Sequence, residues 1–426
     1  MNEAFSHPEW SYNSNIYEVN VRQYTSEGTF ASFEQHLPRL KDMGIEILWF
    51  MPVTPISMKD RLGSMGSYYA AQNYQAINPE FGTLEDFKNL VEHAQEMGFK
   101  IIIDWVANHT GNDHIWIDQH PDYFVYDSVS KELIHPHGWT DVSQLNYDNQ
   151  QMQDAMIDAM KFWITSCNID GFRCDMAHLV PLGFWLLARK ELEKVKPSLF
   201  WLAECEEASY HEVFDASYTW NWMHKTEAFY KQQASLHDLH TLLHSYNLDF
   251  PADAFRVYYT SNHDENSWNG TEYEKYGSAV KVLNVFSFTW NGIPMIYSGQ
   301  ELPNKKRLKF FDKDCIDWVP GLELHEFYKT LISLRKRNQA LRAGDEDAST
   351  IMISTKYPDK IFAFSRQNKE EEVMVFLNLS ADELEIELDA VIANFIDVFS
   401  GQPWQSIHQK TLVLPPWDYK ILEKNP

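Results

Sequence analysis

The sequence predicts an α/β fold, namely a (β/α)₈ TIM barrel with a short domain inserted after strand 3 and a C-terminal antiparallel β-sandwich. Strand-like and helix-like segments alternate through most of the chain, and the strand-like segments are almost continuously apolar. That pattern is typical of a parallel sheet with helices on both faces. Eight such strands favour a closed barrel. A doubly wound sheet is the alternative, but no glycine-rich phosphate loop follows the first strand.

The first elements follow from local patterns. Residues 15–24 alternate apolar and polar side chains and predict a strand. Residues 29–43 repeat apolar side chains at helical spacing and end at Gly44, which is a good helix stop. Residues 45–52 are apolar throughout and predict a buried strand. One helix therefore connects the first two strands.

The same unit repeats along the chain. Residues 83–97 predict a helix, because Thr83 can cap its N-terminus and two acidic residues fill its first turn. Gly98 ends this helix, and residues 100–106 predict the third strand. Further strands are predicted at residues 171–176, 199–203, 214–218, 255–260 and 292–297.

Two segments interrupt the alternation and set the domain boundaries. Residues 111–148 are rich in His, Asp, Trp and Tyr without clear periodicity, which predicts an inserted domain at the third strand end. From residue 345 onward short alternating strands replace the helices. The predicted domains are therefore the barrel in two parts (1–110 and 149–344), the insertion (111–148) and the sandwich (345–426).

Composition limits the classes of partner. A formal net charge of −25 argues against nucleic acid and anionic membranes, which require a basic surface. No apolar run reaches membrane-spanning length. Aromatic residues make up 15% of the chain, which suits the binding of sugar rings but is explained equally well by large cores. A neutral ligand is the natural substrate, and the oligomeric state is left open.

The compartment is inferred from the N-terminus and the cysteines. The first residues lack a basic segment followed by an apolar one, which predicts no secretory signal and a cytoplasmic protein. The four cysteines, Cys167, Cys174, Cys205 and Cys315, form no CxxC pair. Reduced, largely buried thiols fit that location.

Polar clusters follow four of the predicted strands. They are Asp104 with Asn108 and His109, then Arg173 with Asp175, then Glu204, and finally Asn262, His263 and Asp264. The carboxyl ends of barrel strands meet at one face, where TIM-barrel active sites lie. A single strand-end aspartate is often only a helix cap. Carboxylates converging with histidines and an arginine instead fit acid–base and nucleophilic work on an acetal, as in glycoside hydrolysis.

These motifs resemble the conserved regions of the α-amylase superfamily, glycoside hydrolase family 13. DWVANHT, GFRCDMAH, the glutamate of LAECEE, and SNHD match its four main regions in order. LWFMPVTPI, YYAAQNYQAINPEFGT and GIPMIYSGQE resemble further family segments. The resemblance extends over nearly the whole chain and implies a catalytic barrel, a domain B after strand three and an all-β domain C.

The resemblance also implies roles for the carboxylates. Asp175 would be the nucleophile that forms a covalent glycosyl-enzyme, and Glu204 would be the general acid and then the base. Asp264 would stabilise the oxocarbenium-like transition state. Arg173 is expected to lower the pKa of Asp175, while like charge and partial burial keep Glu204 protonated. A retaining mechanism predicts that the carboxyls of Asp175 and Glu204 lie roughly 5–5.5 Å apart.

Further site residues follow from the same motifs. His109 and His263 would donate hydrogen bonds to the sugar at the cleaved bond, Tyr69 would stack on its ring, and Arg173 belongs to the same substrate-binding set. His178 stands where many family members carry a lysine that reaches the leaving-group sugars. Supporting roles are expected for Asp104 and Asn262, and packing roles for Trp105 and Tyr68. The insertion aromatics, Trp116, Tyr123, Trp139 and Tyr147, are expected to include one or two sugar platforms.

The chemistry needs no cofactor, but many family members hold a structural calcium ion between the barrel and domain B. Asn108 matches one of its ligands. Gln144 replaces the usual acidic ligand, and Leu179 replaces the usual histidine beside a carbonyl ligand. An amide is a poorer ligand than a carboxylate for a hard cation, so the sequence disfavours this calcium.

The expected substrate is an α-1,4-linked glucan such as a maltodextrin or starch. The domain B segment ends VSQLN rather than the QPDLN of the α-1,6-specific branch, which leaves the bond preference open. The alternatives are a transglycosylase, an α-glucosidase or a trehalose synthase with the same intermediate. A non-catalytic carbohydrate-binding protein is the remote alternative, because that class typically loses the carboxylates that are intact here.

Overall fold

The computed structural model describes residues 5–318, 321–387, 394–404 and 411–424. Within these ranges, eight parallel strands close into a barrel in the order β1-β10-β9-β8-β7-β6-β3-β2. The strands are short and buried: β1 (Ile16–Val19), β2 (Ile47–Phe50), β3 (Lys100–Trp105), β6 (Gly171–Cys174), β7 (Phe200–Ala203), β8 (Ala216–Tyr218), β9 (Phe255–Tyr258) and β10 (Ile293–Tyr297). The predicted barrel is confirmed.

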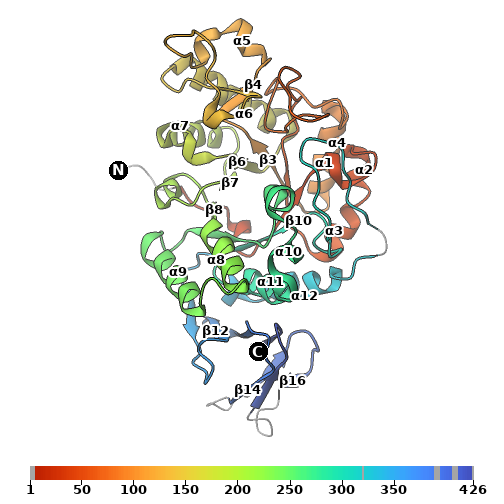
Figure 1. Cartoon of the computed structure of the whole chain (residues 1–426), viewed down its shortest axis with the longest axis vertical. Coiled ribbons are helices and arrows are strands. Elements are labelled where there is room, and N and C mark those ends of the chain that lie inside the picture. Colours follow the sequence, from red (N-terminus) through yellow and green to blue (C-terminus); the bar gives the residue numbers. More distant parts are fainter. Residues whose placement is uncertain (1–4, 319–320, 388–393, 405–410, 425–426) are drawn as a thin grey trace.

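Helices surround this barrel (Figure 1). Their bounds are α1 (Val21–Tyr24), α2 (Phe30–Glu34), α3 (Leu37–Met43), α4 (Leu84–Glu96), α6 (Gln150–Cys167), α7 (Leu182–Glu193), α8 (Trp220–Tyr230), α9 (Leu236–Asp249), α10 (Glu272–Tyr276), α11 (Val280–Thr289) and α12 (His325–Arg337). Thr83 caps α4 and Asp86 bonds back to Thr83, as the acidic first turn predicts. Between β7 and β8 the connection is a 3₁₀ helix, Ala208–Glu212, in place of an α-helix.

Two of the predicted elements are wrong in detail. The strand predicted over residues 15–24 ends at Val19, and the chain turns into α1. The helix predicted over residues 29–43 is divided into α2 and α3, with Pro38 in the first turn of α3. Proline is tolerated in a first turn but not in a helix interior, which explains the division. Gly44 ends α3 in the left-handed conformation, as predicted.

The insertion and the C-terminal domain lie at opposite ends of the molecule (Figure 1). The insertion contains α5 (Ile115–Gln119) and an antiparallel pair, β4 (His109–Gly111) with β5 (Val142–Gln144). It therefore begins at His109, close to the predicted boundary. The remaining boundaries stay predictions. The pairing of β4 with β5 joins the start of the insertion to its end.

The C-terminal domain is a sandwich of two sheets. One has six strands: β11 (Ala348–Met352), β12 (Ile361–Asn368), β13 (Glu371–Asn378), β18 (Tyr419–Lys424), β15 (Phe395–Asp397) and β16 (Pro403–Trp404). The other pairs β14 (Leu384–Glu387) with β17 (Thr411–Leu414). Apolar residues of both sheets form one core. Pro415 and Pro416 separate β17 from β18, and residues 388–390 of the predicted C-terminal strands lie outside the described residues.

Other expectations concern membranes and thiols. Within the described ranges, no helix combines the length and the apolar character that crossing a bilayer demands. All four cysteines lie in these ranges and are free, and Cys167, Cys174 and Cys205 are buried. That these thiols are reduced stays a prediction.

Gly171 allows a close approach between two barrel strands. A Cβ atom at this position would lie 2.0 Å from the Phe200 carbonyl oxygen of β7. This distance is far below van der Waals contact, and the atom it meets belongs to the backbone. Only glycine therefore lets β6 pair with β7 in the observed register.

We expect Gly171→Ala to destabilise the protein by about 1–3 kcal/mol or more, because overpacking against a backbone atom cannot be relieved by rotation of a side chain. Chemical denaturation measures this change. The control is Gly183→Ala, where a Cβ meets nothing within 4 Å and α7 gains a better helix former. Equal stability of the two variants would contradict the close approach of β6 and β7.

Candidate active site

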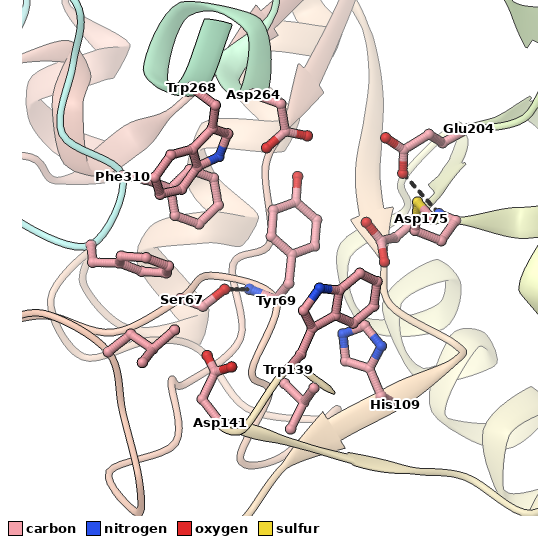
Figure 2. A pocket seen from close by; sticks show the side chains of 14 residues that line it. Ser67, Tyr69, His109, Trp139, Asp141, Asp175, Glu204, Asp264, Trp268 and Phe310 are labelled. Atoms are coloured by element: carbon pink, nitrogen blue, oxygen red, sulfur yellow. Dashed lines mark hydrogen bonds between the residues drawn. The ribbon is translucent and has the colours of Figure 1, made fainter. Parts of the chain in front are cut away.

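A cavity of about 340 Å³ lies at the carboxyl ends of the barrel strands, facing the insertion. Its volume is typical of a site for a small ligand. Figure 2 shows the side chains that surround it. They come from six strand ends or loops and combine carboxylates with aromatic faces: Leu62, Ser67, Tyr69, His109, Trp139, Asp141, Val142, Asp175, Met176, Glu204, Asp264, Trp268, Phe310 and Phe311.

Arg173 connects the carboxylates beneath the cavity. Its Nη1 donates to Asp104 at 2.9 Å and to Asp175 at 3.1 Å, while Nη2 lies 2.9 Å from Glu204 Oε1. The contact with Glu204 is an ion pair without the alignment of a hydrogen bond. The guanidinium is fully buried. A single buried cation is therefore shared among three buried acids.

The pKa of Asp175 is raised well above its ordinary value. Burial is the main cause, and the Glu204 carboxylate adds to it, while Arg173 opposes both. The prediction that Arg173 holds the pKa of Asp175 low is therefore wrong in net direction. The physical reason is that Arg173 is divided between Asp104 and Glu204 as well, so its effect on Asp175 does not offset desolvation.

Glu204 is held by a backbone group of the neighbouring strand end. The Met176 N–H donates to Glu204 Oε2 at 2.8 Å (Figure 2). Met176 follows β6 in a left-handed conformation with φ 40°, which is unusual for a residue with a side chain. This turn directs the Met176 N–H at Glu204 and leaves Asp175 at the cavity wall. Asp175 and Glu204 therefore share both a cation and a backbone connection.

His263 links Asp264 to a glutamate of the first strand. Its Nδ1 lies 2.5 Å from Glu18 Oε1, and its Nε2 lies 3.2 Å from Asp264 Oδ2. Burial lowers the pKa of His263, but Asp264 and Glu18 outweigh burial and raise it well above 6.5. The charged imidazole in turn outweighs burial at Asp264 and holds the pKa of Asp264 below its ordinary value. Asp264 is therefore ionised, whereas Asp175 titrates higher.

Tyr69 and Asp104 complete this network. The Tyr69 hydroxyl is hydrogen-bonded to Asp104 at 3.0 Å and to His263 Nε2 at 2.7 Å, and its ring lines the cavity. Burial raises the pKa of Asp104 to about 6 against the effect of Arg173. Asp104 does not line the cavity, and its expected supporting role stays a prediction. His109 lines the cavity, and burial lowers its pKa to about 4, so its imidazole is neutral at neutral pH.

The structure does not place every predicted contact residue at the cavity. Arg173 and His263 are buried behind its wall, and His178 lies beside Trp220 outside it. Asn262 accepts a hydrogen bond from the Glu265 N–H at 2.8 Å and so supports the turn after Asp264. Trp105 and Tyr68 are 1% exposed, as expected of packing residues.

Of the insertion aromatics, which were expected to include one or two sugar platforms, Trp139 lines the cavity, whereas Trp116, Tyr123 and Tyr147 do not. Other residues at the site were missed by the sequence prediction. Trp268, Phe310, Phe311 and Asp141 line it from loops that carry no strand-end motif. Glu18 could have been found, because a charged residue inside a barrel strand that is buried on both faces requires a partner.

The residues expected around a calcium ion are arranged differently. Gln144 Nε2 donates to the carbonyl oxygen and to the side-chain oxygen of Asn108, both at 3.1 Å. Its third, longer contact is with the Leu145 carbonyl at 3.4 Å. An N–H donor thus occupies the point where these oxygens converge. This donor set does not fit a calcium ion, which needs oxygen ligands without an intervening N–H group.

An eight-stranded parallel barrel with buried carboxylates at its carboxyl ends is the class of fold and site used by barrel glycoside hydrolases. The model of the alpha-amylase catalytic domain matches residues 9–315, and the model of the maltogenic amylase C-terminal domain matches residues 352–421. The chain belongs to the α-amylase superfamily of glycoside hydrolases.

Three relatives illustrate this membership. The alpha-amylase MalA of Haloarcula japonica is 27% identical over 93% of this chain, which spans 59% of the length of MalA. The maltogenic alpha-amylase of Bacillus acidopullulyticus is 25% identical over 91% of this chain and 69% of its own length. The crystal structure of an alpha-amylase from Lactobacillus plantarum is 27% identical and superposes with a TM-score of 0.88 over 97% of this chain and 99% of that one.

We expect Glu18→Gln to move the alkaline limit of stability and activity to lower pH. The folded-state pKa of His263 exceeds its unfolded value, so the stabilisation is complete below that unfolded value and is lost as pH rises through the folded pKa. Without the Glu18 charge that folded pKa falls, and His263 loses its proton earlier. Loss of the charged hydrogen bond should lower the free energy of unfolding by about 1.5–3 kcal/mol. Melting temperatures measured from pH 6 to 9 locate the alkaline limit of stability.

Glu301→Gln is the matched control. Glu301 is also fully buried, but it is bound to Arg39 at 2.8 Å and to Tyr17. The Glu301→Gln variant should lose stability without a change in the alkaline limit of its stability. A uniform loss across the pH range in Glu18→Gln would contradict the role of Glu18 in holding the charge of His263.

Proposed function

We propose that the protein is a retaining glycoside hydrolase that cleaves α-1,4-glucosidic bonds in maltodextrins and starch-type glucans. The observation that supports this most directly is that Asp175, Glu204 and Asp264 line one cavity, with the first two bound to the same arginine. The names of the relatives, an alpha-amylase and a maltogenic alpha-amylase, support the substrate class. In this proposal Asp175 attacks the anomeric carbon and Glu204 protonates the leaving oxygen.

The reactive protonation state needs one proton on the Asp175–Glu204 pair, carried by Glu204. The shared arginine allows this state, because the proton can reside on either acid while Arg173 stays bonded to the other. Asp264, paired with His263, remains ionised and faces the charge that develops on the sugar ring. The neutral His109 imidazole can donate a single hydrogen bond to a sugar hydroxyl. After glycosyl transfer Glu204, now ionised, activates the water that releases Asp175.

Asp175→Asn and Glu204→Gln should each lower kcat by at least about 10³-fold, because one removes the nucleophile and the other the acid. Asp122→Asn, an exposed change in the insertion, is the control and should leave kcat unchanged. Initial rates on maltoheptaose measure this, with circular dichroism to confirm folding. Rates near those of the wild type in either variant would refute the assignment.

The stereochemistry and the product range test the remaining parts of the proposal. Proton NMR of the first product should show the α-anomer, and the β-anomer first would exclude a retaining mechanism. Longer oligomers formed from maltotriose would indicate the transglycosylase alternative. The products formed from maltose, pullulan, cyclodextrin and starch distinguish α-glucosidase, trehalose synthase and α-1,6 activities from one another. We further propose that the enzyme is cytoplasmic and acts on maltodextrins rather than on granular starch. Activity on starch granules without activity on maltoheptaose would refute this substrate preference.

We also propose that the site at Asn108 holds no calcium and that the Gln144 amide bridges its oxygens instead. Chelation or added Ca²⁺ should then leave the melting temperature of the wild type unchanged. Gln144→Glu places a carboxylate oxygen against the Asn108 oxygens and should cost about 1–3 kcal/mol, recovered in part when Ca²⁺ is added. Differential scanning calorimetry measures both effects.

Gln153→Glu is the matched control for this experiment. Gln153 Nε2 donates to the Tyr147 carbonyl at 2.7 Å, so the change removes a similar donor without a second converging oxygen. It should be destabilised without recovery in Ca²⁺. A large fall in the melting temperature of the wild type on chelation would overturn the proposal.

A further inference from the structure

A second, smaller cavity lies where the segment after β9 meets the start of α10 and the end of β10. Its volume of about 10 Å³ is that of a single water-sized sphere. Polar side chains line it, among them Ser261, Glu272, Tyr297 and Gln300. It shares no lining residue with the larger cavity described above. The smaller cavity is therefore a separate feature of the fold.

Glu272 is the one charged residue among those that line this cavity, and it is 3% exposed. Its Oε2 atom accepts hydrogen bonds from Thr260 Oγ1 at 2.8 Å and from Gln300 Nε2 at 2.7 Å. Burial raises the pKa of Glu272 to about 7, and only neutral hydrogen-bond donors oppose this rise. No lysine, arginine or histidine within the described ranges forms an ion pair with it. A buried carboxylate is ordinarily paired with a cation or bound to a metal ion.

Three side-chain oxygens at this cavity have no hydrogen-bond partner in the part of the chain that the structure describes. They are Glu272 Oε1, Ser261 Oγ and Tyr297 Oη. Ser261 and Tyr297 are each 2% exposed, so neither hydroxyl is on the surface. Nearly all buried polar groups in native proteins are satisfied, and three unpartnered oxygens around one small cavity therefore indicate a bound species.

The amide side chains around the cavity direct their N–H groups to protein acceptors. Gln300 Nε2 donates to the Oε2 atom of Glu272, as described above. The side chains of Asn266 and Asn304 both donate to the Lys306 carbonyl oxygen, at 3.2 Å and 3.1 Å. Among the described residues that line the cavity, the unpartnered side-chain atoms are thus oxygens in every case. Oxygen is the ligand that hard metal cations prefer.

We propose that this cavity binds one monovalent metal cation, with Glu272 as its charged ligand and Ser261 and Tyr297 as its neutral oxygen ligands. One carboxylate balances one positive charge. A calcium ion instead takes about six to eight oxygen ligands, more than the unpartnered oxygens found here. The bound cation joins the segment after β9 to α10 and to β10, and so stabilises the folded protein. This inference does not depend on the proposed hydrolysis.

The first test compares the melting temperature of the wild type in sodium chloride and in choline chloride at equal ionic strength. Both salts screen the net charge of −25, but choline is too large for the cavity. The measurement is made at about pH 8, where Glu272 is ionised. Above half-occupancy, each ten-fold rise in sodium concentration should add about 1–2 °C that choline does not add. Equal melting temperatures in the two salts would overturn the proposal.

Variants of the ligands locate the ion. Glu272→Gln keeps the shape of the side chain without its charge, and should abolish the difference between the two salts. Tyr297→Phe removes one neutral ligand and should raise the sodium concentration at half-occupancy about ten-fold. Glu301→Gln is the matched control, because Glu301 is fully buried but already paired with Arg39 at 2.8 Å. It should lower the melting temperature in both salts and keep the difference between them.

Sodium NMR gives a second, direct measurement. The wild-type protein should broaden the sodium resonance, and Glu272→Gln should remove most of this broadening. A difference between the salts that persists in Glu272→Gln would place the ion elsewhere and overturn the proposal. Stabilisation by calcium chloride but not by sodium chloride would overturn the assignment of a monovalent cation.

Discussion

The buried guanidinium of Arg173 is the interaction on which the rest of the site depends. It is surrounded by the rings of Trp49, Tyr69 and Tyr218, with Trp49 closest at 4.8 Å, and it has no contact with water. A buried cation of this kind is tolerated only because carboxylates pair with it, and those carboxylates are tolerated only because of the cation. Removing either partner leaves an uncompensated buried charge. The strand ends are therefore held in one arrangement by mutual compensation.

A second charge network lies beside the first and is linked to it through Tyr69 and Asp104. His263 is paired with Glu18 and Asp264, and Tyr69 joins it to Asp104. The two networks shift the pKa values of neighbouring acids in opposite directions. His263 outweighs burial at Asp264, whereas Arg173, which is shared among three acids, does not outweigh burial at Asp175. One acid stays ionised and the other titrates higher, although both lie at the same cavity. In the proposed reaction the proton of the Asp175–Glu204 pair must lie on Glu204, so that Asp175 is free to attack.

The sequence predicted the parts of the molecule that repeat. Eight apolar strands and the strand-end motifs are regular patterns, so the barrel and the position of Asp175, Glu204 and Asp264 followed from them. Trp268, Phe310 and Asp141 could not be predicted, because loops bring them to the cavity and no periodicity marks a loop. The sign of the Asp175 pKa was missed for a different reason. Sequence shows that Arg173 is two residues away, but it does not show that Asp104 and Glu204 bind the same guanidinium.

The insertion connects the Gln144 amide to the part of the cavity wall that contains Asp141. Asp141 immediately precedes β5, and β5 ends at Gln144, whose amide is bonded to Asn108 at the start of the insertion. Asp141 is thus separated from the Gln144–Asn108 hydrogen bond only by the residues of β5. A neutral amide clamp does not dissociate as an ion does. The Gln144 side chain thus joins the two ends of the insertion through the oxygens of Asn108.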